Sequence, residues 1–364
     1  MSVVPWTGVR RVAVVPVFNK QVDPPPPPDW AFQVRSRVFY DPDPATGQDR
    51  SFQNYLHALS YGRAFIDGEV FPPVFADDAE VNIPAMNSLP AGHGYTHLLA
   101  VLPHSFGPDR GGFAFWDFPP VNGITAWARV ALYDDRLLTV RQPIGVWGME
   151  ILHMTTKFTD LYFTNPNLGN YDVMAGAGAS THASAHTKQT MGWLPFGKIV
   201  VPSAGNSTVK LQAIAMPQPP PPDRATAVRI PSKLNTNHFM VEARLAVDAY
   251  EKSNGPNDGI PAEGVIVYEV ANTFSVFLRS IPTLSVGKEY TNAEEGLRIR
   301  VKEAIPGGFT IDIQSDPSAE CPRIRDDIAT LKEILETEED PIIRRQLRQK
   351  ISALEARAKQ LGCP

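Results

Sequence analysis

Three residues of the segment WGMEILH, residues 147–153, have the types and spacing of a catalytic metal site. Glu150 and His153 occupy the second and fifth positions of the pattern H-E-x-x-H, and Met149 stands where that pattern has its first histidine. Positions i and i+4 share one face of a helix, so two histidines at this spacing can bind one zinc ion. The glutamate lies beside the metal and takes a proton from its bound water. The segment therefore supplies a base and one ligand for hydrolysis, with a weak thioether ligand in place of the other.

The pentapeptide alone is weak evidence, because a half-buried helix can also carry a core-filling methionine and a hydrogen-bonded histidine. Residues downstream favour a site. Asp160 follows His153 closely enough to supply a third, oxygen ligand. Met174 lies in the Gly-rich stretch NYDVMAGAG, which resembles the methionine turn beneath the zinc of metzincins. His182 and His186 then follow at helical spacing.

The order of these motifs resembles the immune inhibitor A-like (M6-like) family of secreted zinc metallopeptidases. The resemblance rests on GVWG-MEILH-MTTKFTDLY, NYDVMAG and SAHTKQTMGWL. These strings are similar to the family's G-x-W-H-E-x-x-H, the D-L-Y close behind it, its W/Y-D-x-M turn and its K-x-x-x-G-W-L helix. Flanking segments extend the likeness over roughly residues 8–315. The resemblance implies a secreted zinc endopeptidase acting on polypeptides, with Glu150 as general base, His153 and Asp160 as zinc ligands and Met174 in the methionine turn.

Two departures from the family pattern bear on activity. Met149 replaces the first zinc histidine, so we expect zinc to bind weakly or not at all. Asp160 lies seven residues after His153, whereas six is the commoner family spacing. His182 and His186 are candidates for a replacement ligand. We favour instead an exposed helix N-terminus and a hydrogen-bonded core histidine for these two residues.

Two functional classes therefore remain open. One is an active zinc metalloendopeptidase whose metal is held by His153, Asp160 and a replacement ligand. The other is a pseudopeptidase that keeps the fold and binds a peptide, a protein or a glycan without hydrolysing it. We predict a degenerate zinc site that is weakly active or inactive on peptides, because losing one of three ligands lowers zinc affinity strongly.

The order of the expected strands and helices that position these residues predicts an α+β fold. Apolar runs typical of strands, and helical spacing at 52–59, precede a helix over about 145–157 and a second helix around 182–192. Short β runs separated by turn signals then fill 197–316. We therefore expect three parts: a zincin-like peptidase domain over 1–196, a β-sandwich-like domain over 197–318 and a helical hairpin over 319–364.

The predicted hairpin rests on two apolar stripes at helical spacing. They consist of Ile324, Ile328, Leu331 and Leu335, followed by Ile343, Leu347, Ile351, Leu354, Ala358 and Leu361. Asp340 and Pro341 suit the N-cap and the first position of the second helix. With Cys321–Pro322 extended, a Cys321–Cys363 disulfide can close an antiparallel pair, and two buried free thiols are the alternative. A disulfide indicates an oxidising compartment, so we expect an extracellular rather than a cytoplasmic protein.

Charge and hydropathy exclude two classes of partner. The formal net charge is −5, whereas binding to nucleic acid needs clustered Lys and Arg. No apolar run approaches the roughly 18–20 residues of a membrane span. The stretch SNGPNDGIPAEG at 253–264 has the Asn, Asp and Gly content of a calcium loop without EF-hand spacing, so calcium is a candidate cofactor without further support. The expected partner is a polypeptide substrate or ligand.

Overall fold

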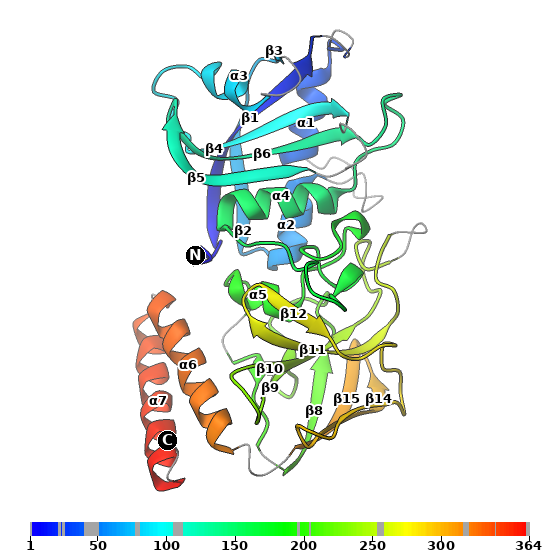
Figure 1. The fold of residues 1–364 in the computed structure, drawn as a ribbon, viewed down its shortest axis with the longest axis vertical. Coiled ribbons are helices and arrows are strands. Elements are labelled where there is room, and N and C mark those ends of the chain that lie inside the picture. Colours follow the sequence, from blue (N-terminus) through cyan, green and yellow to red (C-terminus); the bar gives the residue numbers. More distant parts are fainter. Residues whose placement is uncertain are drawn as a thin grey trace. The chain divides into compact units, whose positions relative to one another are not determined.

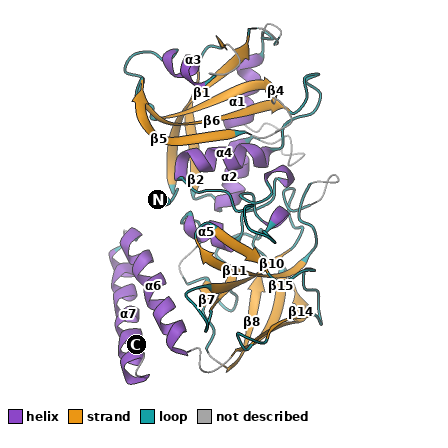
Figure 2. Cartoon of the chain, viewed as in Figure 1, coloured by secondary structure: helices purple, strands orange, loops and turns teal. Residues whose placement is uncertain are grey.

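The computed structural model describes residues 2–20, 23, 26–39, 51–76, 81–104, 112–194, 197–203, 205–252, 258–315, 320–338 and 340–361. The fold is of mixed α and β type (Figures 1 and 2). The chain divides into two compact units. The first contains Met1–Pro195 and Ala246–Pro261, and the second contains Phe196–Leu245 and Ala262–Pro364. This division differs from the predicted boundaries, because residues 246–261 belong to the first unit and the C-terminal helices group with the second.

The first unit is built on a six-stranded sheet. Its strands are β1 (Gly8–Asn19), β2 (Ala64–Val70), β3 (Val74–Ala76), β4 (His97–His104), β5 (Phe113–Val121) and β6 (Ile124–Tyr133). The order is β2-β1-β4-β6-β5, with β3 also paired to β1. Neighbours are parallel except β5, which runs antiparallel to β6 at the edge. The Val-rich run in β1 is buried from Val12 to Phe18, as expected for a strand covered on both faces.

Helices cover both faces of this sheet (Figure 1). They are α1 (Trp30–Phe39), α2 (Phe52–Ser60), α3 (Asn82–Asn87) and α4 (Ile144–Thr156). The first unit also contains α5 (Ala185–Thr190). Ala85 and Met86 of α3 share a core with apolar residues of β1, β4 and β6. On the other face α4 lies along β5 and β6. The predicted helix over about 145–157 is therefore confirmed by α4.

The second predicted helix is shorter than expected. We predicted helical structure over about 182–192, whereas α5 spans Ala185–Thr190. Ser184 is its N-cap, and the side-chain oxygen of Ser184 accepts a hydrogen bond from the backbone N–H of Thr187. A capping serine fixes the start of a helix by satisfying a free N–H group. His182 consequently lies before the helix, and only His186 lies on it.

The second unit contains two sheets. Their strands are β7 (Ile199–Val200), β8 (Gly205–Gln212), β9 (Ala227–Pro231), β10 (His238–Arg244), β11 (Gly264–Asn272), β12 (Ser275–Leu278), β13 (Glu289–Asn292), β14 (Leu297–Ile305) and β15 (Gly308–Ser315). One sheet has the order β12-β11-β10-β9-β7 and the other β13-β14-β15-β8. Alternate residues of both sheets form one apolar core, for example Val241 and Val267 with Ile299 and Ile311. The predicted β character of residues 197–316 is thus present.

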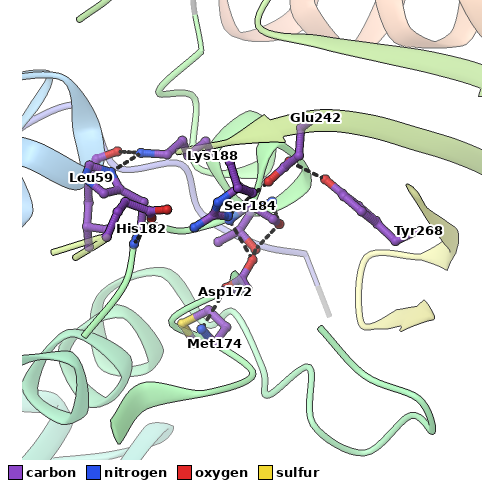
Figure 3. A network of polar contacts seen from close by, with 11 residues as sticks. Leu59, Asp172, Met174, His182, Ser184, Lys188, Glu242 and Tyr268 are labelled. Atoms are coloured by element: carbon purple, nitrogen blue, oxygen red, sulfur yellow. Dashed lines mark hydrogen bonds and ion pairs between the residues drawn. The ribbon is translucent and has the colours of Figure 1, made fainter. Parts of the chain in front are cut away.

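A buried ion pair lies within β10. Arg244 Nη1 donates to Glu242 Oε1 at 3.0 Å, and both side chains are fully buried. The hydroxyl of Tyr268 donates to the other carboxylate oxygen of Glu242 at 2.9 Å (Figure 3). A buried carboxylate needs such partners, because an unpaired charge in the core is costly. Glu242 and Arg244, which lie two residues apart on one face of β10, therefore pair with each other in the core.

The C-terminal helices are α6 (Glu320–Thr337) and α7 (Pro341–Leu361). The predicted stripes meet in a core of Leu331, Leu347 and Ile351, with Ile328, Ile334, Leu335, Ile343 and Leu354 packed around it. The expectation that Cys321–Pro322 is extended is wrong, because α6 already begins at Glu320. Proline suits the first turn of a helix, where its missing N–H has no helical partner.

Cys321 is disulfide-bonded. The sequence has only one other cysteine, Cys363, which lies outside the described residues. The pairing of these two cysteines stays a prediction. At its N-terminal end α6 is joined to β9 by Arg229, whose Nε lies 2.7 Å from Asp326 Oδ2.

Among the helices of the described ranges, none combines the length and the apolar content needed to cross a membrane.

Candidate functional site

Helix α4 carries Met149, Glu150 and His153, and its neighbours hold it closely. The indole N–H of Trp147 donates to the carbonyl of Ala131 on β6 at 2.9 Å. A Cβ atom on Gly148 would lie 2.7 Å from the Tyr55 ring, so glycine permits close approach to α2. Only 7%, 7% and 6% of Met149, Glu150 and His153 are exposed. The candidate residues are therefore fixed in a packed helix and nearly shielded from solvent.

His153 and Asp160 form the centre of the candidate site. The Nδ1 atom of His153 bonds to the carbonyl oxygen of Phe158, so this nitrogen is the donor. In the neutral ring Nε2 then has a free lone pair, and Nε2 lies 2.9 Å from Asp160 Oδ1. Two acceptors at this distance need a proton or a cation between them. The pKa of His153 is raised: burial lowers it, but the bond to Asp160 and the charges of Asp160 and Glu150 outweigh burial.

Glu150 lies in the same charged group and is buried. Burial raises the pKa of Glu150 to about 7, against the opposing effects of His153 and Arg129. The backbone at Gly112, immediately before β5, covers this side chain, since a Cβ atom there would lie 2.2 Å from Glu150 Cγ. A carboxylate with a pKa near neutrality suits a general base.

Residues that the sequence did not single out complete the surroundings. The Trp116 ring on β5 stacks on His153, with centroids 6.0 Å apart and planes inclined by 20°. Lys157 Nζ donates to Asp117 at 2.7 Å and so joins the end of α4 to β5. Burial and a hydrogen bond to Asp160 raise the pKa of Tyr162 to about 12. The contacts of Trp116 and Asp117 depend on strand β5 folding back beside α4, and no local pattern indicates them.

The stretch containing Met174 forms a tight turn, and Asp172 organises it. One oxygen of Asp172 accepts the backbone N–H of Met174 at 2.7 Å. The other accepts the N–H of Ser184 at 2.9 Å and the hydroxyl of Thr187 at 2.6 Å (Figure 3). The carbonyl of Met174 accepts the N–H of Leu161, next to Asp160, at 2.8 Å. The turn is therefore joined directly to the segment that carries Asp160.

His182 and His186, the candidates for a replacement ligand, are both buried. The expectation of an exposed helix N-terminus is therefore wrong for His182. Its Nε2 lies 2.7 Å from Asp248 Oδ2, and its Nδ1 lies 3.3 Å from Lys188 Nζ. The ammonium can only donate, so Nδ1 accepts and Nε2–H donates to Asp248. The His186 ring lies 6.3 Å from the Phe158 ring.

Lys188, His182 and Asp248 belong to a buried polar network. Lys188 is fully buried and donates to the carbonyl of Leu59 (Figure 3). The backbone N–H of His182 donates to Glu251 at 3.0 Å. Residues 246–261 supply both acidic groups, which explains why this segment belongs to the first unit. These contacts give His182 a structural role.

The pKa of Asp248 lies well below its ordinary value. Burial raises it, but the electrostatic interaction and hydrogen bond with His182, together with two backbone N–H groups, outweigh burial. A carboxylate whose pKa falls on folding stabilises the protein above its unfolded pKa, and this contribution disappears as the pH falls through the folded pKa. We expect Asp248→Asn to lower the free energy of unfolding by about 3 kcal/mol near neutral pH, since it breaks a mostly buried pair.

Thermal unfolding of the wild type and Asp248→Asn at several pH values checks this prediction. The difference in Tm should shrink as the pH falls below about 4, because Asp248 of the unfolded chain takes up a proton there while the folded carboxylate stays ionised. Asp67→Asn is the matched control, because the Asp67 side chain is 65% exposed and its distance to Arg11, 4.0 Å, is too long for a strong ion pair. A difference in Tm for Asp248→Asn that is independent of pH would contradict the assignment.

The donor atoms fit part of a zinc site. Zinc holds histidine nitrogen and carboxylate oxygen at about 2.0–2.2 Å. His153 Nε2 and Asp160 Oδ1 fit as two such donors, with Nδ1–H of His153 held by a carbonyl as in many metal sites. Within the described ranges, no three His, Cys, Asp or Glu side chains are grouped to hold a metal ion. Neither His182 nor His186 completes the pair in this arrangement.

Residues 253–257 of the calcium-loop stretch lie outside the described residues, so calcium binding there stays a prediction.

No protein-family model matches the sequence, and no curated protein matches it.

Proposed function

We propose that this protein is a homologue of the M6-like zinc metallopeptidases with a degenerate metal site, which binds polypeptide and hydrolyses it weakly or not at all. The observation that carries the proposal is the pairing of His153 with Asp160 beside the buried Glu150, on a helix with methionine at the other ligand position. In this proposal the first unit is a zincin-like domain and the second a β-sandwich.

The proposed metal ligands are His153 and Asp160. Zinc bound there would polarise a water molecule and lower its pKa. Glu150, with a pKa of about 7, would accept the proton of that water. The chain itself contributes the orientation of His153, through the Phe158 carbonyl and the Trp116 ring, and the exclusion of bulk water from Glu150.

Met149 is the reason for proposing weak or absent hydrolysis. Its thioether is a soft ligand that suits Cu(I) better than Zn²⁺. Its side chain is buried, so it fills space in the packed helix whether or not a metal is present. Two protein ligands in place of three leave the ion weakly held.

Strand β5 supports polypeptide as the ligand. It lies at the edge of the sheet and carries Phe113 and Phe115, which are 45% and 49% exposed. An edge strand presents backbone N–H and C=O groups to which an extended peptide can add as a further strand. Trp116 and Asp117 of the same strand reach His153 and Lys157, so a peptide on β5 would lie beside the candidate site.

The alternative is an active endopeptidase, and the raised pKa of Glu150 favours it. It requires a replacement ligand. If that ligand is His182, the ring must leave both Asp248 and Lys188.

Glu150→Gln tests the assigned role of the base. The amide cannot accept a proton from water, so any hydrolysis of casein should be lost. The zinc content should equal that of the wild type, because the base is not a ligand. Elemental analysis and a casein assay measure the two quantities, with the exposed Glu69→Gln as the matched control. Loss of zinc in Glu150→Gln would show that Glu150 binds the metal directly and would contradict the proposal.

A further inference from the structure

The sheet formed by β13, β14, β15 and β8 carries a hollow of about 350 Å³. Polar side chains line it: Asn206, Thr208, Arg298, Arg300, Asp312 and Gln314. They alternate along the strands with core residues such as Ile299 and Ile311, so they lie on the face opposite the core. This volume is at the lower end of the about 300–1,000 Å³ typical of small-molecule sites.

Arg300 is the distinctive residue of the hollow. Arg298 makes two hydrogen bonds to Glu289 Oε2, at 2.6 and 3.0 Å. The carboxylate of Asp312 accepts the Thr208 hydroxyl through Oδ1 at 2.6 Å. Arg300 lies between these two acidic residues in the strand register, yet no described residue makes a hydrogen bond or ion pair with it. Among the described residues its guanidinium has no partner, so it can donate to a ligand in the hollow.

We propose that this hollow binds a uronic acid, a sugar that carries one carboxylate and several hydroxyl groups. The planar guanidinium of Arg300 matches a carboxylate in a two-bond arrangement. The free oxygen of Asp312 can accept a hydroxyl proton, and the amides of Asn206 and Gln314 can both donate to and accept from hydroxyl groups.

The charge and shape of the hollow favour this ligand over others. Its lining contains two arginines and one aspartate, so it suits one carboxylate better than a dense polyanion. The ladders of β14 and β15 are already paired on both sides, so a peptide could add as a strand only at an edge strand such as β8 and not over Arg300. The lining contains no aromatic residue, so charge and hydrogen bonds must supply the affinity.

Calorimetric titration of the full-length protein with galacturonic acid tests the proposal, with its methyl ester as the neutral probe. The acid should bind saturably, and binding should weaken as salt is raised. Arg300→Gln should weaken binding about tenfold or more, the expected effect of losing a charge-assisted pair. Arg348→Gln on α7 removes the same charge outside the hollow and should leave binding unchanged.

Three results would overturn the proposal. These are equal binding of the neutral methyl ester, unchanged binding by Arg300→Gln and tighter binding of a polyglutamate peptide than of the uronate. Circular dichroism of Arg300→Gln should match the wild type, because Arg300 has no described partner and is exposed. The candidate site on α4 is not used in this test, so its outcome is separate from that of the proposed peptidase homology.

Discussion

Met149→His is expected to raise the zinc affinity of this protein by more than about 100-fold, since loss of even an outer-shell partner of a metal site costs about 10–100-fold. The new imidazole would stand one helical turn before His153, the spacing at which two rings bind one ion. Together with Asp160 it would complete three protein ligands. Competition against a chromophoric chelator measures the affinity, and casein hydrolysis should appear in the zinc-loaded variant.

Met149→Ala is the control that opens space at this position without adding an imidazole ring. It removes the thioether without supplying a nitrogen, so neither zinc affinity nor hydrolysis should increase. Met149→Leu keeps the volume and should behave as the wild type does. If the wild type already binds one zinc per chain as tightly as Met149→His and cleaves casein as fast, the degenerate-site account is wrong. His182 and His186 would then be the first residues to test as ligands.

Asp172→Ala is expected to lower the free energy of unfolding by about 5 kcal/mol, because hydrogen bonds to a charged group contribute about 1.5–3 kcal/mol each. Asp172 is fully buried and accepts from Met174, Ser184 and Thr187. Alanine would leave these donors without their acceptor and release the turn that carries Met174. The Tm of the first unit should fall by about 10–20 °C.

Two further variants grade this effect. Thr187→Val removes one of the three donors and should cost about 1.5 kcal/mol. Asp172→Asn keeps the shape but exchanges one acceptor oxygen for a donor, so its Tm should lie between those of the wild type and Asp172→Ala. Calorimetric unfolding measures all three. A Tm for Asp172→Ala within a few degrees of the wild type would show that the turn does not depend on this carboxylate.

Local patterns predicted the elements that carry the candidate site. The apolar segment from 145 to 157 forms α4 because nearly every side chain in it is buried. The stripes of the C-terminal segment form α6 and α7 because their apolar residues meet in one small core. Such patterns are sufficient where an apolar segment or a periodic apolar face by itself indicates the element, as in α4 and in α6 and α7.

Contacts between distant segments could not be predicted in this way. His182 meets Asp248 across 66 residues, and no spacing in the sequence connects them. His182 was therefore expected at an exposed helix N-terminus, although it is buried and both of its ring nitrogens have protein partners. The start of α5 had a local signal in the sequence, because Ser184 is a good N-cap residue. At the start of α6, Cys321 and Pro322 are helical, so a proline near a helix start is not evidence for extended chain.

The zinc content of the wild-type protein tests the central claim most directly. After incubation with zinc and dialysis, elemental analysis should find less than one zinc per chain in the wild type, and less still in His153→Ala. This result is expected if His153 and Asp160 are an incomplete ligand set. One tightly held zinc per chain in the wild type, or a zinc content that His153→Ala leaves unchanged, would contradict the account.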